Sequence, residues 1–113
     1  MDVFTTLIQN QMLNTFANAL QGTNLVELTF KSNNQGIITR TCAPMDYGPW
    51  RHTGTGELRY HFIDIDSTDG MHPLSIQEEK IVTLRMLEEK FEPANLITWT
   101  PDWHIVRDWG VYS

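Results

Sequence analysis

Seven residues of the chain combine the side-chain types that recognise a phosphate-bearing ligand. They are cations, imidazoles and aromatic rings from two predicted strands and the loop between them: Arg40, Tyr47, Trp50, Arg51, His52, Arg59 and His61. A cation beside an aromatic ring can hold a phosphate while the ring stacks on a base, as in single-strand binders. If the two strands pair antiparallel, Arg40 and Arg59 come close together below two aromatic rings. The alternative is a solvated strand face whose arginines pair with Glu57 and Asp64.

The segment DIDSTDG, residues 64–70, resembles a calcium-binding loop only superficially. An EF-hand loop needs Gly at its sixth position and Glu at its twelfth, where this chain has Asp69 and Ser75. The dipeptide Asp-Gly is itself a strong turn signal. The segment therefore predicts a hairpin turn, with weak divalent-ion binding as the alternative.

The histidines and the single cysteine form no catalytic or metal-binding motif. The four histidines are His52, His61, His72 and His104. No two of them are close enough in sequence to share one helical turn. Cys42 has no Gly-rich elbow or neighbouring base, so it is interpreted as a packing residue rather than a nucleophile. No catalytic residue, metal or cofactor is predicted. The remaining enzymatic alternative is a small hydrolase that uses His61 with Asp64 or Asp66.

Length and composition predict one domain in a reducing compartment. The 113 residues are 41% hydrophobic and 19% charged, which is typical of globular domains that fold without disulfides. One cysteine excludes an internal disulfide. The sequence has neither a secretory leader nor a run of 18 apolar residues. We therefore expect a cytoplasmic protein that has no membrane segment.

The formal net charge of −6 arises in the second half of the chain. Residues 1–56 carry three acidic and three basic residues, whereas residues 57–113 carry eleven and five. Nucleic acids bind to clustered Lys and Arg that displace counterions, so an acidic chain is a poor candidate for unaided nucleic-acid binding. A local basic face is still compatible with this composition.

The N-terminal segment has the spacing of an amphipathic helix from Asp2 to Leu20. Its apolar residues recur at three- and four-residue steps: Phe4, Leu7, Ile8, Met12, Leu13, Phe16, Ala17 and Leu20. Asp2 suits the N-cap and Gly22 suits the stop. The opposite face is rich in Gln and Asn and carries no charge, so it can face either water or a partner subunit. We expect first that the helix covers the core of its own chain.

From residue 26 onward the apolar period changes from about 3.6 to 2, which marks a switch from helix to strand. Strands are predicted over 26–31, 37–43, 57–66 and 72–77, with turns at 32–36 and 67–70. The prolines and glycines of residues 44–56 predict a long loop. A change of apolar phase in the third strand predicts a bulge or bend near Phe62. Residues 80–88 favour a fifth strand because Ile81 and Val82 are β-branched, with a helix over 78–90 as the alternative.

The segment 58–93 ends in a pattern that resembles a WYL domain. The pattern consists of Leu74-Ser75-Ile76, then Glu79-Lys80-Ile81, then LRMLEEKFEP over residues 84–93. WYL domains are small barrels of the Sm/SH3 type that often act as ligand-sensing modules of bacterial regulators. The resemblance covers about a third of the chain and implies a nucleotide or single-stranded nucleic acid as the ligand.

The C-terminal segment is rich in aromatic residues, with Trp99, Trp103, Trp109 and Tyr112. Rings of this size rarely hang free in water, so the segment is expected to dock. Its expected place is on the barrel of its own chain, and the alternative is a neighbouring subunit.

These observations together predict a mainly β fold, namely a small five-stranded Sm/SH3-like barrel over residues 24–91. A helix over 1–22 precedes the barrel and a docked aromatic tail over 92–113 follows it, in a single domain of residues 1–113. The leading functional hypothesis is a non-enzymatic binding module of the bacterial cytoplasm for nucleotide or single-stranded nucleic acid. The alternative is a structural homo-oligomer joined through the helix face and the tail tryptophans.

Overall fold

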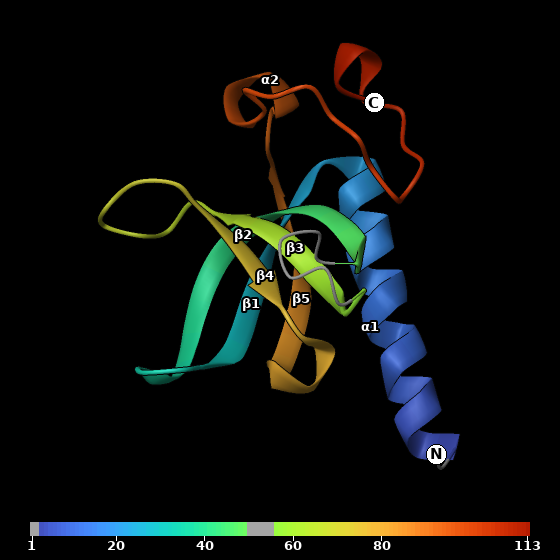
Figure 1. Ribbon diagram of the computed structural model, residues 1–113, viewed down its shortest axis with the longest axis vertical. Helices are drawn as coiled ribbons and strands as arrows, with labels where there is room; N and C mark the ends of the chain where they lie inside the picture. Colours follow the sequence, from blue (N-terminus) through green and yellow to red (C-terminus); the bar gives the residue numbers. More distant parts are fainter. Residues whose placement is uncertain (1–2, 50–55) are drawn as a thin grey trace.

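One long helix and a five-stranded antiparallel sheet form the core of the computed structural model, which describes residues 3–49 and 56–113. The helix is α1 (Val3–Gly22), and the strands are β1 (Asn24–Ser32), β2 (Gly36–Pro49), β3 (Leu58–Asp64), β4 (His72–Ile76) and β5 (Ile81–Lys90). Three short helices complete the order: η1 (Glu78–Lys80) between β4 and β5, then α2 (Pro93–Leu96) and η2 (Gly110–Tyr112) (Figure 1). The predicted mainly β class with an N-terminal helix is confirmed.

The strands follow the order β4-β3-β2-β1-β5, with every neighbouring pair antiparallel. The first four strands are consecutive neighbours, and the last strand returns to the free side of the first. Strands β4 and β5 are therefore the two edges, and the sheet is not closed. The structure shows an open sheet where the sequence predicts a barrel.

The fifth strand is confirmed over the alternative of a helix. β5 pairs with β1 along most of its length, with Leu28 opposite Leu84. The predicted turns are also present, because Ser32 pairs with Gly36 at the end of the first hairpin and the Gly70 amide donates to the Ser67 carbonyl at 3.3 Å. These turns position the two hairpins that frame the candidate site.

Strand β2 is longer than the sequence predicts. The predicted loop over 44–56 is wrong for residues 44–49, which pair with β3 as a continuation of β2. The predicted bulge lies in this strand rather than in β3, because one extra residue, Met45, interrupts the register opposite Phe62 and His61. A proline is tolerated beside such a bulge because the ladder is already interrupted there. The alternation of apolar and polar residues changes in β3 because the successive residues Phe62 and Ile63 are both buried, one on each face of the sheet.

Helix α1 covers the sheet only with its C-terminal half. Phe16, Ala19 and Leu20 are fully buried, whereas Phe4, Leu7 and Ile8 are more than half exposed. The prediction that all these apolar residues share one buried face is therefore wrong. Figure 1 shows the N-terminal half of the helix standing away from the sheet.

Helix α1 ends at Gly22, as predicted. Gly22 is the last helical residue, and the left-handed conformation falls on Thr23 with φ of 54°. Gly22 is needed for space, because a Cβ atom there would lie 2.5 Å from the Asn24 Oδ1. The predicted N-cap, Asp2, lies outside the described residues.

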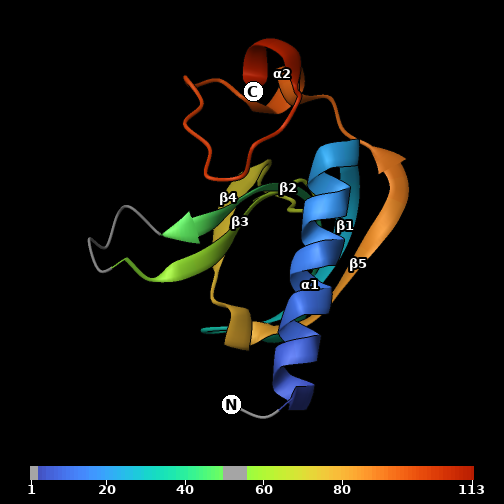
Figure 2. The same ribbon diagram turned by 90° about the vertical axis from the view of Figure 1, so that its right-hand side faces the viewer.

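The C-terminal tail packs on its own chain. It crosses one end of the sheet beside the C-terminal end of α1 (Figure 2). Trp109 is 6% exposed, and its Nε1 donates to the Leu20 carbonyl at the end of α1 at 3.0 Å. Its ring meets the Phe91 ring edge to face at 5.5 Å between centroids. Across the described ranges, none of the helices has the length and apolar character needed to cross a membrane.

Candidate functional site

Arg59 and His61 lie on the same face of β3 and meet at Ser75 of β4. The Arg59 Nη1 donates to the Ser75 carbonyl at 3.1 Å, and the His61 Nδ1 lies 2.8 Å from the Ser75 Oγ. Residues 61 and 75 are directly opposed in the β3–β4 ladder, which fixes this contact. The structure thus brings together two of the seven predicted site residues through a serine that the sequence did not single out.

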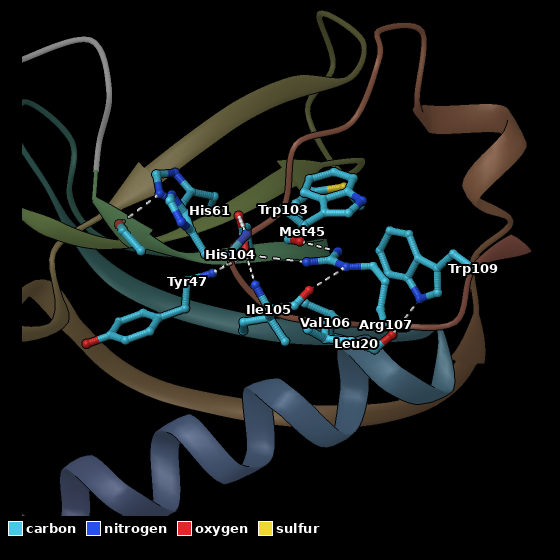
Figure 3. A network of polar contacts seen from close by, with 12 residues as sticks. Leu20, Met45, Tyr47, His61, Trp103, His104, Ile105, Val106, Arg107 and Trp109 are labelled. Carbon is cyan, nitrogen blue, oxygen red and sulfur yellow. Dashed lines mark hydrogen bonds and ion pairs between the residues drawn. The ribbon is translucent and has the colours of Figure 1, made fainter. Parts of the chain in front are cut away.

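The other predicted residues lie elsewhere. Tyr47 is on the opposite face of the sheet, where its ring packs on Tyr60 at 4.5 Å between centroids, and it points away from His61 in Figure 3. Arg59 of β3 is paired with Gly48 of β2. Arg40 lies eight positions before Gly48 on β2, and eight residues of strand span roughly 25 Å. Arg40 and Arg59 therefore lie far apart. The predictions for Trp50, Arg51 and His52 fall outside the described residues.

Both arginines have the acidic partners that the alternative interpretation named. The Arg40 Nε lies 3.5 Å from the Asp64 Oδ2, and the Arg59 Nη2 lies 2.9 Å from the Glu57 Oε2. Hydrogen bonds from Arg59 and Gln77 hold the pKa of the Glu57 carboxyl below its usual range, so it stays charged. Arg59 differs from Arg40 in lining a cavity, which is described below.

A pocket of about 300 Å³, here called the tail pocket, lies between the β3–β4 face and the C-terminal tail. Its apolar walls come from both sides: Phe62, Ile63, Pro73, Leu74, Trp99 and Trp103. Its polar groups are few and convergent: Asp46, His61, Ser75, Thr100, Asp102 and His104. Apolar walls with a few placed polar groups are typical of small-molecule sites.

A second hollow of about 300 Å³, here called the basic pocket, lies between the end of the β1–β2 hairpin, β4 and η1. Its lining includes three cations, Lys31, Arg59 and Lys80, and no carboxylate among the described residues. The Lys80 Nζ donates to the neutral Asn33 Oδ1 at 2.8 Å, which holds this ammonium group at the pocket. The sequence analysis missed both lysines because they are 49 positions apart, and only the sheet order brings them together.

The two pockets share part of their lining. Leu74 and Ser75 border both of them, so the pockets follow one another along β4. We call the run of residues 73–77, with the pockets beside it, the β4 strip. β4 is an edge of the sheet, so its outer side has no neighbouring strand within residues 3–49 and 56–113. The strip therefore combines aromatic walls at one end with cations at the other.

A buried polar network, here called the tail clip, holds the tail against β2. The Asp46 carboxylate accepts the backbone amides of Tyr47, His104 and Ile105 at 2.9–3.0 Å. It also lies 3.3 Å from the Arg107 Nη2. The Arg107 side chain is fully buried and also donates to the carbonyl oxygens of Met45 and Ile105.

Two tryptophans enclose the guanidinium of the tail clip. The Arg107 Cζ lies 4.0 Å from the centroid of the Trp103 ring and 4.5 Å from that of Trp109 (Figure 3). Burial lowers the pKa of Arg107 to about 10, with Asp46 opposing the shift, so Arg107 stays charged at neutral pH. The clip uses its polar groups internally and sets the position of the tail pocket wall.

Gly48 brings the tail close to β2. A Cβ atom at this position would lie 2.3 Å from the His104 Cδ2, so only glycine leaves room for this imidazole. His104 in turn lines the tail pocket. The PMDYGP segment, interpreted from sequence as a loop, thus supplies both the carboxylate and the space on which the tail docks.

His61 is held as a neutral imidazole. Its Nε2 lies 3.2 Å from the Gly48 carbonyl, which can only accept, so this nitrogen carries the proton and Nδ1 accepts from the Ser75 hydroxyl. Burial lowers the pKa of His61, and the Gly48 carbonyl and Asp46 oppose that shift. The arrangement fixes the imidazole and the hydroxyl at the border of the two pockets.

The aspartates proposed for a hydrolase or a metal site have other partners. Asp64 pairs with Arg40 and accepts the Asp66 amide at 2.8 Å, and Asp66 accepts the Thr41 amide at 3.3 Å. Within residues 3–49 and 56–113, no cluster of three His, Cys, Asp or Glu side chains could hold a metal ion. Cys42 is buried in the core, where burial raises the pKa of its thiol and keeps it protonated.

Comparison with known proteins gives no relative from which a function could be transferred. No family model matches the chain, and neither a curated protein nor a solved structure matches it. The resemblance to WYL domains stays a prediction. The functional argument therefore depends on the pockets themselves.

Proposed function

We propose that the protein is a non-enzymatic binding module that recognises a nucleotide or a short single-stranded nucleic acid along the β4 strip. The observation that carries this proposal is the adjacency of an aromatic pocket and a cationic pocket, which share Leu74 and Ser75. Nucleotides have the same division, with a planar apolar base at one end and phosphates at the other. A ligand of this class can occupy both pockets at once.

The base is assigned to the tail pocket. Trp99 is 46% exposed and packs edge to face on Trp103, with 6.1 Å between ring centroids, so it presents an accessible ring at the pocket. Stacking a base on such a ring contributes about 1–3 kcal/mol and tolerates any base. The Ser75 hydroxyl and the groups of Thr100 and Asp102 supply polar contacts for the base edge.

The phosphate is assigned to the basic pocket. Lys31 and Lys80 are compact charges on flexible stems, which suit a phosphate group. Arg59 is already paired with Glu57, so its guanidinium adds fixed donors at the border but less net charge than the lysines. Three cations favour a mononucleotide or a short strand over a long duplex, in agreement with the acidic net charge of the whole chain.

We also propose that the sheet is a partly open barrel of the Sm/SH3 type, related to WYL domains, in a bacterial cytoplasmic protein. An N-terminal helix followed by five strands, with the last strand beside the first, supports this assignment. One buried cysteine agrees with a reducing compartment.

The test compares two ion-paired arginines, Arg59 at the strip and Arg40 beyond the other end of the β2–β3 ladder. Binding of ADP and of a short oligothymidylate is measured by calorimetry at low salt for the intact protein and for Lys80→Ala, Arg59→Ala and Arg40→Ala. We expect Lys80→Ala to weaken binding by about tenfold or more, because a charge-assisted contact contributes about 1.5–3 kcal/mol and 1.4 kcal/mol is about a factor of ten. Arg59→Ala weakens binding as well, since it also releases the Glu57 carboxylate beside the pocket.

Arg40→Ala is the matched control, because it breaks a similar ion pair away from the strip. We expect its affinity to equal that of the intact protein. Failure of the intact protein to bind either ligand at low salt overturns the proposal. An equal loss in Arg40→Ala and Arg59→Ala overturns the assignment to the strip.

A further inference from the structure

The first two turns of α1 expose four large apolar side chains. Val3 is 73% exposed, Phe4 77%, Leu7 51% and Ile8 59%. We call these four residues the tip patch. They lie next to one another on the helix surface, because positions three and four apart are neighbours. Single exposed apolar residues are ordinary, but four in one cluster indicate a contact surface.

The tip patch points away from the sheet of its own chain. At about 100° per residue, its centre is turned roughly 140° around the helix axis from that of Phe16, Ala19 and Leu20. The polar Thr5 and Gln9 occupy the positions of the first two turns that align with Phe16 and Leu20. Of the four patch residues, only Ile8 aligns with a core residue, Ala19. A small tilt of the helix therefore cannot bury the patch on its own sheet. A second molecule has to cover it.

We propose that the tip patch binds the tip patch of a second copy of this chain, so that two α1 helices cross on a twofold axis. In such an interface the same patch is used twice, so four residues become a cluster of eight. The N-terminal half of α1 stands clear of the sheet, which leaves room for a second helix (Figure 1). This surface lies outside both pockets of the β4 strip, so the proposal is independent of the proposed function.

The charge distribution favours a second copy over a different partner. α1 contains no charged residue from Val3 to Gly22, although the chain carries a net charge of −6. Two acidic copies can approach at this neutral helix without opposing like charges. A basic or acidic partner would find no complementary charge on residues 3–22.

The polar residues beside the patch are also self-complementary. Gln11, Asn14 and Asn18 continue the side of the helix on which the patch lies. An amide side chain both donates and accepts, so identical amides can pair across a twofold axis. The sequence analysis noted this uncharged Gln and Asn face as a possible subunit contact, and the structure adds the apolar patch at its end.

The mass of the protein in solution tests the proposal. Multi-angle light scattering over a concentration series is applied to the intact chain and to the double variant Phe4→Gln/Ile8→Gln. We expect the intact chain to approach twice 13.1 kDa as concentration rises and the variant to stay at 13.1 kDa. The control is Val106→Gln/Val111→Gln, which removes two residues that are 88% and 87% exposed in the tail and which should behave as the intact chain.

A crosslink locates the contact. Leu7→Cys on the tip patch should form a disulfide-linked dimer under mild oxidation, whereas Ile37→Cys, on the 64% exposed hairpin residue, should not. Circular dichroism checks that each variant is folded. A monomer at the highest concentration, a dimer that survives Phe4→Gln/Ile8→Gln, or equal crosslinking of both cysteine variants overturns the proposal.

Discussion

The tail clip and the β4 strip use similar side chains for different purposes. In the clip, Arg107 is fully buried between two tryptophans, and Asp46 together with backbone carbonyls accepts its donors. In the strip, Arg59 is 18% exposed and borders a hollow with two lysines. A cation beside aromatic rings therefore indicates a ligand site only where some of its surface stays open. Burial decides between the two roles.

The tail clip also positions one wall of the pocket at the aromatic end of the β4 strip. Asp46 binds His104, Ile105 and Arg107 of the tail. Gly48 leaves room for His104, so the position of the tail against β2 is fixed. Trp99 and Trp103 then form the far wall of the tail pocket. The structural network thus builds one side of the proposed binding site.

Breaking the clip should have the largest effect. Asp46→Ala leaves the Arg107 charge buried without its partner and two tail amides without an acceptor. We expect a loss of about 3–5 kcal/mol in the free energy of unfolding, measured by urea denaturation. Ligand affinity should fall with it, because the pocket wall is no longer held.

The control for this prediction is Arg85→Ala, which breaks the exposed ion pair between Arg85 on β5 and Glu27 on β1. Exposed pairs contribute about 0–1 kcal/mol, so its unfolding curve should nearly match that of the intact protein. If Asp46→Ala is no less stable than Arg85→Ala, the clip does not hold the tail and the comparison fails.

The sequence predicts the elements better than it predicts the site. Period and turn chemistry are local properties, and the helix and both turns follow from them. The fifth strand follows from the local β-branched residues Ile81 and Val82. The extension of β2 does not, because Pro44 and Pro49 suggest a loop and only pairing with β3 overrides that preference. The prediction for α1 does not capture its exposed tip, because three- and four-residue steps drift around the helix, and the apolar residues of the first two turns leave the face of Phe16 and Leu20.

The site depends on contacts between distant residues, which a single sequence does not contain. Arg59 and His61 were identified from their chemistry, but Ser75 joins them only through the register of β3 and β4. Lys31 and Lys80 line the same pocket only because β5 returns to β1 and η1 lies beside the hairpin. The buried pairing of Asp46 with Arg107 spans 61 positions and has no local signal.

The titration of His61, at the border of the two pockets of the β4 strip, should change the free energy of unfolding less than the loss of the tail clip does. Because burial lowers its folded pKa below the ordinary 6.5, the unfolded chain takes up a proton first as pH falls. Its contribution to stability is therefore complete above about pH 6.5 and is lost as pH decreases toward the folded pKa. We expect the free energy of unfolding of the intact protein to fall between pH 7.5 and 5.5.

The variant His61→Gln isolates this contribution, because it removes one imidazole and leaves the other three histidines of the chain in place. Denaturation at the two pH values should show a weaker pH dependence in His61→Gln than in the intact chain. Both measurements are made above pH 5, so that protonation of the Glu57 carboxyl, whose pKa lies below its ordinary 4.5, does not contribute. An unchanged pH dependence in the variant means that the imidazole is not held neutral at the border of the pockets.

The most direct test of the central claim is to map where a nucleotide binds. Titration of ADP into isotope-labelled protein at low salt, followed by amide and indole shifts, reports on both regions at once. We predict that the largest changes fall on residues 73–77, Lys80 and the Trp99 indole, while the Arg107 side chain and the Trp109 indole stay unchanged. Changes centred on the tail clip, or no change anywhere, would contradict the assignment of the β4 strip as the ligand site.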